Sequence, residues 1–390
     1  MALNYEQIST VLNTIVQDVT GQSATFNIRN TGDFVAAATT ALSVGTDPIM
    51  NSISQMIGRT IISVRPYEPA ANLIDMDALT YGNVVRKITP IFVDGAIDQP
   101  MYDDQPADGQ STDQYKIKRP RALETRFSGF SQWMVQAPTV FEDQLRAAFS
   151  GPSQLDDFLT AQMTAVNNEI NSQKEALAHS TIANFIGAKS IRGGANFRHV
   201  LTEYNTLTGL SLTIADVYAP ENFESFVKWL YAYIADCSDL MTKRSTLYHE
   251  PITGYTVMRH TPKSEQRLLM YSFILRAFKT MALSGIYNDD LLKMDVTAPV
   301  EYWQSLTDRT TVKVNASYTD AGGDELTGNA TVTNVIGILF DREAMGVNVN
   351  LERTAVSPLN SSGLYYNTFY HFTRRYYNDI SENAIVFCLD

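Results

Sequence analysis

The chain has 390 residues, 44% of them hydrophobic and 18% charged, with a formal net charge of −12. This apolar content excludes an intrinsically disordered chain, because burying apolar surface can offset the entropy that is lost on folding. The acidic balance argues against a protein that binds nucleic acid by neutralising phosphates over a wide surface, and the length predicts roughly two to three compact units.

Residues 1–65 are expected to form an arm rather than a domain. Apolar residues recur at helical spacing between Tyr5 and Val19, which predicts an amphipathic helix. The segment Gly21–Asp47 has few large apolar side chains, so we expect it to pack on another part of the chain or on another subunit. The first residues lack the basic start and apolar core of a secretion signal, and no apolar run reaches the roughly 18 residues of a membrane span. We therefore expect a protein of a cytosol-like compartment with no membrane partner.

A long β-hairpin is predicted next. The strand-like segments Val84–Ile88 and Lys116–Lys118 flank a turn-rich segment, Asp94–Asp113, which contains six aspartates and no basic residue. The hairpin would have an acidic tip and a basic base, and an isolated two-stranded ribbon is only marginally stable in water. We therefore expect it to lie on a neighbouring molecule.

The acidic tip has three possible roles. A calcium loop is disfavoured because the aspartates do not alternate and no glutamate ends the loop. A solvated loop and a contact with basic residues of a neighbour both stay open. The candidate subunit-contact residues are charged side chains of the hairpin, together with two arginines near the C-terminus: Asp98, Asp103, Asp104, Asp108, Asp113, Lys116, Lys118, Arg119, Arg121, Arg374 and Arg375.

The strongest helix signal covers residues 154–187. Apolar side chains recur at helical spacing from Leu155 to Phe185, Ser153 is the expected N-cap, and Gly187 is the expected stop. A helix of this length measures about 50 Å, longer than a small domain is wide. A core helix of a bundle is the alternative, although the sequence offers no second helix of matching length.

The rest of the chain mixes helices and strands without a regular βαβ rhythm, so the expected fold class is α+β. A turn is predicted at 320–324, between two of the strands. The predicted helices are Phe223–Met241 and a segment that begins at Thr261 and runs through Phe278. The predicted strands are Phe130–Val135, Tyr255–Met258, Val312–Tyr318, Val332–Phe340, Val347–Leu351 and the terminal run Ala384–Leu389.

Motifs of catalysis are missing from the sequence. It has no phosphate-binding glycine loop, no nucleophile elbow and no H-E-x-x-H pair, and its five histidines are scattered. Cys237 and Cys388 lie in apolar runs and are expected to be buried, reduced thiols. We therefore predict no catalytic, cofactor-binding or metal-binding residues and no enzyme activity. A hydrolase with an irregular carboxylate site at Asp103 and Asp104 is a remaining alternative.

Aromatic residues and Arg374-Arg375 gather in the segment Tyr365–Tyr377. They could stack on the bases of a single-stranded nucleic acid. The net acidity and the strand-like flanks favour a surface that packs in a sheet or against a subunit.

Two segments near the C-terminus carry a family resemblance. The strand Val335–Phe340, followed by Asp341–Val347, resembles a late segment of tailed-bacteriophage major capsid proteins. The segment Pro358–Phe372 resembles the corresponding stretch in small short-tailed phages. The direct match covers about the last 60 residues, while the order of arm, hairpin and long helix is similar over most of the rest.

The resemblance implies a Hong Kong 97-like fold with its usual parts. These would be an N-terminal arm at 1–65, a P-domain at 66–83 and 128–199 with a spine helix at 154–187, an extended E-loop at 84–127, a mainly A-domain segment at 200–334, and return strands of the P-domain at 335–390.

The resemblance also implies a function. Such proteins form pentamers and hexamers of identical subunits that close an icosahedral phage head around double-stranded DNA, which they contact without reading its sequence. A scaffolding protein and a portal would be further partners, with assembly in the host cytoplasm, residence in the virion, and no cofactor. The predicted hairpin tip has no lysine, so we do not expect the covalent cross-link of some relatives. An encapsulin-like cellular nanocompartment shell is the alternative within the same fold.

Overall fold

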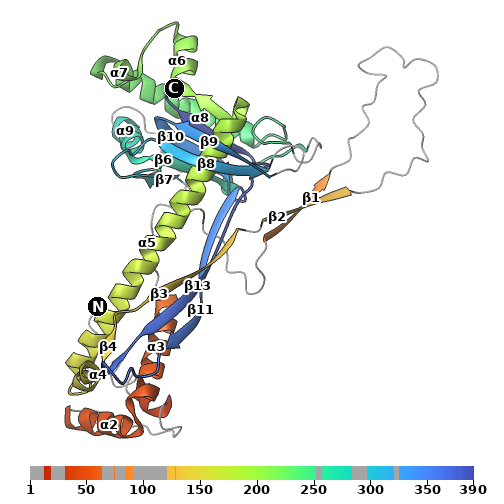
Figure 1. The fold of residues 1–390 in the computed structure, drawn as a ribbon. Helices are drawn as coiled ribbons and strands as arrows, with labels where there is room; N and C mark the ends of the chain where they lie inside the picture. Colours follow the sequence, from red (N-terminus) through yellow and green to blue (C-terminus); the bar gives the residue numbers. More distant parts are fainter. Residues whose placement is uncertain are drawn as a thin grey trace.

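The computed structural model describes residues 13–18, 31–63, 74, 85–91, 121–127, 129–251, 257–282, 297–319 and 325–390. The helices are α2 (Thr31–Val44), α3 (Thr46–Ser63), α4 (Glu142–Ala148), α5 (Pro152–Arg192), α6 (Val200–Thr208), α7 (Ile214–Val217), α8 (Pro220–Met241) and α9 (Ser272–Ala282). The strands are β1 (Val85–Ile91), β2 (Arg121–Phe127), β3 (Phe130–Gln136), β4 (Val140–Phe141), β5 (Phe197–His199), β6 (Gln266–Tyr271), β7 (Thr297–Val300), β8 (Val312–Thr319), β9 (Glu325–Val332), β10 (Val335–Asp341), β11 (Met345–Val356), β12 (Tyr365–Tyr366), β13 (Thr368–Asn378) and β14 (Ala384–Cys388). The α+β class is confirmed (Figure 1).

The long helix predicted at 154–187 is confirmed as α5, and it extends further at both ends. It has 41 residues, which correspond to about 60 Å. Gly151 is the N-cap, in place of the expected Ser153, and Pro152 occupies the first turn, where its missing N–H costs nothing. The expected stop at Gly187 is wrong. The helix ends at Gly193, whose positive φ of 65° suits glycine.

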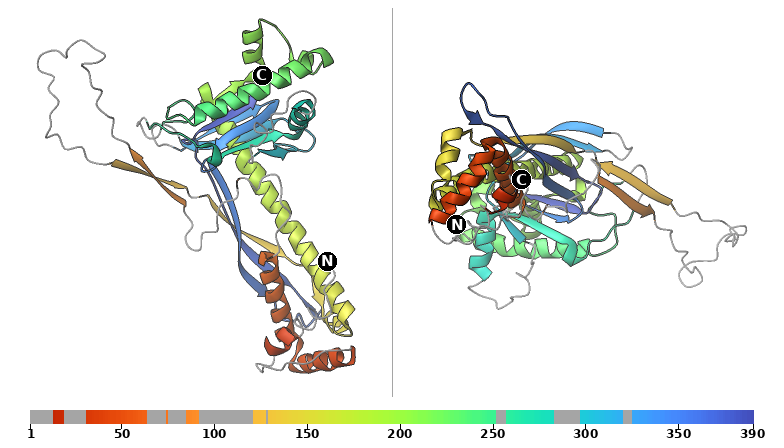
Figure 2. Two further views of the ribbon diagram at one scale, coloured as in Figure 1. Left: turned by 180° about the vertical axis from the view of Figure 1, so that it is seen from behind. Right: turned by 90° about the horizontal axis from the view of Figure 1, so that it is seen from below.

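Helix α5 connects two hydrophobic cores that lie at opposite ends of the molecule (Figure 2). Its first half carries Leu155, Leu159 and Val166 into a core shared with α2, α3 and the three-stranded sheet β11-β13-β3. Its second half carries Ile182 and Phe185 into a core shared with the β8–β9 hairpin and the larger sheet. The helix therefore acts as a rigid beam between the two ends.

The N-terminal segment packs on its own chain. Residues 13–18 are helical and bury Ile15 and Val16, while the remainder of the helix predicted at Tyr5–Val19 lies outside the described residues. Helices α2 and α3 were not predicted from the segment around Gly21–Asp47. Small buried side chains such as Ala37 and Ala38 allow α2 to lie close to the core that it shares with the first half of α5 and the three-stranded sheet. The helix therefore needs few large apolar residues.

The larger sheet has the strand order β5-β14-β10-β6-β7. The predicted terminal strand is confirmed as β14, which pairs antiparallel with β10 and parallel with β5. Alternate side chains of β14 enter different cores: Val386 faces the α5 side, and Ile385 and Phe387 face α6, α8 and α9. The sheet is thus buried on both faces. Cys237 and Cys388 are buried free thiols, as predicted.

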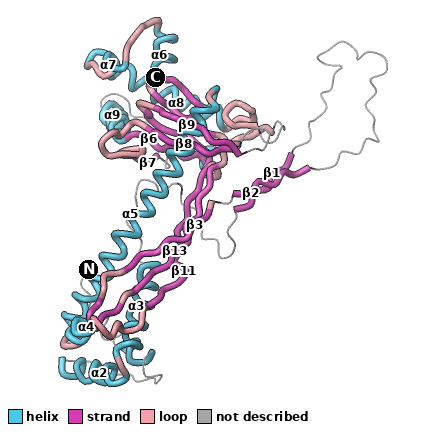
Figure 3. Tube along the Cα trace, in the orientation of Figure 1, coloured by secondary structure: helices cyan, strands magenta, loops and turns pink. Residues whose placement is uncertain are grey.

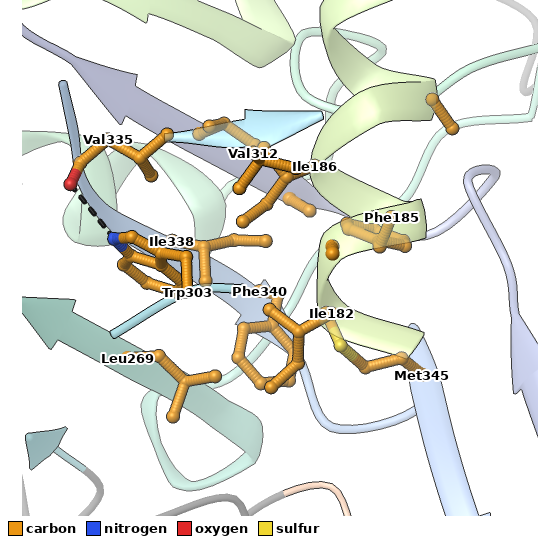
Figure 4. Packing of buried hydrophobic residues seen from close by; sticks show 14 of the residues in the cluster. Ile182, Phe185, Ile186, Leu269, Trp303, Val312, Val335, Ile338, Phe340 and Met345 are labelled. Carbon is orange, nitrogen blue, oxygen red and sulfur yellow. Dashed lines mark hydrogen bonds between the residues drawn. The ribbon is translucent and has the colours of Figure 1, made fainter. Parts of the chain in front are cut away.

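Trp303 is fully buried between α5 and the larger sheet, and its indole Nε1 donates a hydrogen bond to the carbonyl oxygen of Val335 over 2.9 Å (Figure 4). We expect Trp303→Phe to lower the free energy of unfolding by about 2 kcal/mol, because it removes ring volume and leaves a buried carbonyl without its donor. Denaturant titration measures the change. Trp133→Phe, at a partly buried tryptophan on the three-stranded sheet, is the control and should cost less than half as much. Equal costs for the two variants would contradict this assignment.

The helix predicted from Thr261 through Phe278 is wrong up to residue 271 and confirmed only from Ser272 onward. A short 3-10 turn (Lys263–Glu265) leads into strand β6, and α9 begins only at Ser272. The apolar run in β6 fits a short buried strand as well as a helix, so its periodicity does not decide between them. Thr261 does not cap a helix, because its hydroxyl donates to the Asp341 carboxylate over 2.7 Å.

Other predictions had mixed outcomes. The helix at Phe223–Met241 is confirmed as α8, and three strands are confirmed as β3, β8 and β11. The strand predicted at Val332–Phe340 is interrupted, because β9 ends at 332 and β10 begins at 335, with Asn334 at a φ of 52° between them. Of the strand predicted at Tyr255–Met258, 255 and 256 lie outside the described residues, and the other two are not in a strand. β8 and β9 pair as a hairpin across the predicted turn at 320–324, whose own residues are not described.

Candidate functional site: the projecting hairpin and its ionic anchor

Strands β1 and β2 form a ribbon that leaves the body and projects sideways (Figures 1 and 3). They pair antiparallel from Val85 opposite Phe127 to Ile91 opposite Arg121, so the base of the predicted hairpin is confirmed. The predicted strand at Lys116–Lys118 lies outside the described residues. So do most of the candidate contact residues: Asp98, Asp103, Asp104, Asp108, Asp113, Lys116, Lys118 and Arg119.

The two faces of β1 have different surroundings. Lys87 and Thr89 point toward the body and are largely buried, whereas Arg86 and Ile88 are exposed. This alternation is the ordinary period of a strand. One face of the ribbon is therefore available for attachment to the body, and the other is available to a partner.

The inward face is held by four charged side chains, Lys87, Arg259, Asp379 and Glu382, which we call the ionic anchor. The Lys87 ammonium lies 3.2 Å from Oδ2 of Asp379 and contacts Oε1 of Glu382. The Arg259 guanidinium contacts the same oxygen of Glu382 and donates to the hydroxyl of Ser381 over 3.3 Å. Both carboxylates are 4% exposed, so they share two cations in a nearly dry site.

Helix α5 contacts the turn that carries Asp379 and Glu382. The Lys189 ammonium is completely buried and donates to the carbonyl oxygens of Ile380 and Glu382 over 2.9 and 3.4 Å. Burial lowers the pKa of Lys189 to about 8. Asp379 accepts hydrogen bonds from the backbone and hydroxyl of Ser381, which fixes the turn between β13 and β14. The hairpin base is thus connected through this turn to α5.

Burial and charge act in opposite directions within the ionic anchor. Burial lowers the pKa of Lys87, but Asp379 and Glu382 raise it by more, so it lies above its ordinary value and the ammonium stays charged. Burial raises the pKa of Glu382 to about 7, against the effect of Lys87 and Arg259. The raised pKa of Lys87 requires ionised carboxylates beside it. The raised pKa of Glu382, in contrast, permits a proton on that carboxylate. We take Glu382 as ionised above neutral pH, because two cations contact one of its oxygens.

The outward face of the ribbon carries a smaller charged group. Arg86 and Arg126 lie directly opposite each other, and Oε1 of Glu124 accepts from both, over 2.6 and 2.7 Å. These hydrogen bonds lower the pKa of Glu124 to about 2. The group is exposed, so its own contribution to stability is small. Beside it Ile88 is 64% exposed, which gives this face both charge and apolar surface for a partner.

The structure does not bring Arg374 and Arg375 to the hairpin. Both lie on β13: Arg374 sits over the Trp133 ring and donates to the hydroxyl of Ser131 over 3.1 Å. Arg375 is 5% exposed, so its side chain is inside the chain. Tyr370 and Phe372 of the same strand are buried in the core shared with α2, α3 and the first half of α5, whereas Tyr376 is exposed. The two buried rings serve sheet packing, one of the roles considered for this segment.

The ionic anchor was not predicted from the sequence. Lys87 stands in a run of apolar and basic residues that reads as an ordinary strand, and Asp379 and Glu382 follow the aromatic strand almost 300 residues later. One usable signal was available, namely two acids in a short turn directly before a fully apolar strand. Aspartate and glutamate are rarely buried unless they are paired, so acids held next to a buried strand need cations nearby.

The described part of the chain offers no grouping of three histidine, cysteine or carboxylate side chains that could hold a metal ion. Within those same residues, no helix combines the length and the apolar character that a bilayer crossing requires. Asp103 and Asp104, the alternative carboxylate site, lie outside the described residues.

Comparison with known proteins identifies one family. The model of the Phi29-like phage major capsid protein family matches residues 12–388. No curated protein matches the chain.

Similar solved structures include the capsid of Staphylococcus phage Andhra, at 11% identity and a TM-score of 0.49 over 82% of this chain and 83% of that chain. The structure of head fiber and inner core protein gp22 of native bacteriophage P68 is similar at 10% identity and a TM-score of 0.49, over 82% and 84%. The capsid of cyanophage P-SCSP1u is similar at 13% identity and a TM-score of 0.41, over 83% and 89%.

Proposed function

This chain belongs to the Phi29-like phage major capsid protein family, which makes it a structural protein of the phage head shell, and we propose that its copies assemble as pentamers and hexamers into a closed icosahedral shell around packaged double-stranded DNA. The observation that carries this proposal is the ribbon β1–β2, which projects from the body with one face attached and the other exposed. A two-stranded ribbon gains little stability by itself, so its length is explained by a second surface on a neighbour.

The ionic anchor supports this role for the hairpin. Lys87 and Arg259 fasten the base of the ribbon to the turn at 379–382, and this turn is held by α5. A fixed base sets the direction in which the hairpin leaves the body. Each copy can then reach its neighbour at the same place, which repeated symmetric contacts require. We assign the subunit-contact role to the charged hairpin residues from Asp98 to Arg121.

The division of the chain follows from the same proposal. Helix α5 is the spine helix and the hairpin is the E-loop. The lobe formed by α6, α7, α8 and α9 belongs to the A-domain. The net charge of −12 supports contact with DNA without sequence recognition, because an acidic wall repels phosphates and lets DNA slide. We include a scaffolding protein and a portal as partners and place assembly in the host cytoplasm.

Replacing residues 99–112 by a short Gly-Ser turn tests the proposal. The shortened chain should keep its circular dichroism spectrum, because the anchor and both cores are untouched, but it should form no closed shells by electron microscopy. The matched control keeps the length and replaces only Asp103 and Asp104 by asparagine. We expect this control to form shells in reduced yield. Normal shells from the shortened chain would overturn the assignment of the hairpin as a contact arm.

A further inference from the structure

Helix α8 runs across the lobe, and the segments around its start and beyond its end differ in charge, although Asp236 and Asp239 lie in the last turns of α8 itself. The segment 213–227, at the start of α8, contains three acids and no basic residue. The segment 242–267, beyond its end, contains five basic residues against two acids. Residues 228–241 of α8 separate these segments by about 20 Å. We call them the acidic end and the basic end.

The acidic end also exposes aromatic surface. Tyr218, Phe223 and Phe273 form a triangle of ring contacts, with centroids 5.8, 6.0 and 6.3 Å apart. Tyr218 and Phe273 are about half exposed although they touch each other. The carboxylates of Asp216 and Glu221 are exposed beside them. This mixture of packed aromatic rings and a charged rim is typical of a protein interface.

The basic end has the complementary character. Leu247 and Met258 are exposed there, next to the exposed Leu240 of α8. Lys243 is exposed among them, whereas Lys263 pairs with Asp239 over 2.5 Å. Arg259 of the same segment belongs to the ionic anchor, so the basic end lies near the hairpin base. Helix α7, at the acidic end, lies on the side of the lobe away from the hairpin (Figure 2).

We propose that the acidic end of one copy packs against the basic end of the next copy, so that copies join head to tail in a ring. This inference rests on the proposed function, and it adds which surfaces meet within a pentamer or hexamer. Opposite charge attracts the acidic end of one copy to the basic end of another. A two-fold contact could pair these ends twice between two copies, but the proposed pentamers and hexamers need each end to meet a different neighbour. A head-to-tail contact pairs opposite charges and buries both apolar patches, and it closes into a ring when its rotation allows.

Cysteine cross-linking tests the contact directly. The variant Tyr218→Cys with Leu247→Cys, treated with a flexible bismaleimide, should give a ladder reaching five and six copies on a denaturing gel. The unsubstituted chain is the blank, because Cys237 and Cys388 are buried. Each single-cysteine variant should stay monomeric. Dimers from a single-cysteine variant would show a two-fold contact, and a conjugate with another protein would show a different occupant. Either result, a product that stops at two copies, or no cross-linked product would overturn the proposal.

Charge reversal gives an independent test. Glu221→Lys and Lys243→Glu should each lower the yield of rings about tenfold by sedimentation, because each places like charges in contact. The double variant restores opposite charges and should recover most of the yield, whereas a failure to recover would overturn the pairing. Asp157→Lys, at the far end of α5, is the control for the change of charge. Micrographs of the unsubstituted chain test the shell separately, since rings without closed shells would contradict the proposed function alone.

Discussion

Replacing Lys87 by methionine is expected to lower the free energy of unfolding by about 3 kcal/mol, because it leaves two buried carboxylates with one cation. Lys87 lies within 3.2 Å of Asp379 and contacts Glu382, and its neighbours are almost completely buried. Methionine keeps most of the side-chain volume, so the change reports the loss of charge. Urea titration measures the difference, and hydrogen exchange should be faster along β1.

Arg86→Met is the matched control, because it removes a cation from the next residue of the same strand. Arg86 faces solvent, and its contact with Glu124 is exposed. The expected change is much smaller than for Lys87→Met, because an exposed ion pair contributes little to stability. If both variants lose the same stability, the two faces of β1 do not differ as the structure indicates, and the ionic anchor does not hold the hairpin.

The cost of Lys87→Met should depend on pH. The pKa of Glu382 is raised above its ordinary value of 4.5, so the folded chain keeps a proton that the unfolded chain releases. The stabilisation from this proton is present below pH 4.5 and is lost as the pH rises through about 7. A protonated Glu382 does not need the Lys87 ammonium. We therefore expect a smaller cost at pH 5 than at pH 8, and the opposite order would contradict this assignment.

The parts of the fold that the sequence predicted well are those with local signals. Helix α5 repeats apolar residues over many turns, and the strand at Ala384–Leu389 is wholly apolar, so each is recognised without knowledge of its partners. The hairpin and its first strand were recognised from the change of composition around Asp94–Asp113, whereas the predicted second strand, Lys116–Lys118, lies outside the described residues. Helix α2 has no such signal, since its buried face is made of alanines.

The candidate site could not be predicted in the same way. Lys87 and Asp379 meet only because β13 returns along α5 and turns beneath the hairpin, and 292 residues separate them. No local pattern encodes such a contact. Arg375 shows the reverse error: the pair Arg374-Arg375 suggested a contact surface, but the strand period places Arg375 inside the protein.

Gly187 gives the second large effect, and here tertiary packing and helix propensity predict opposite signs. The residue lies inside α5 under the β8–β9 hairpin, where a Cβ atom would stand 2.4 Å from Cγ2 of Val314. The same Cβ atom would lie 3.1 and 3.3 Å from the methyl groups of Ala316 and Ala330. The β8–β9 hairpin would therefore have to move away from the helix at three side chains. Propensity alone predicts that Gly187→Ala stabilises the helix by about 1 kcal/mol.

We expect Gly187→Ala to lower the free energy of unfolding by about 2 kcal/mol, because overpacking of about 3 kcal/mol exceeds the gain in propensity. Val314→Ala removes the contact at 2.4 Å and provides the matched test. The double variant should be more stable than the sum of the single changes predicts, by about 1 kcal/mol. Denaturant titration of the four proteins closes this cycle. If Gly187→Ala stabilises the protein, or if the two single changes in the free energy of unfolding are additive, then the packing of β8 on α5 does not require glycine at residue 187. A destabilising Gly187→Ala that Val314→Ala relieves would explain why α5 carries, deep in its buried face, a residue that local rules assign to its end.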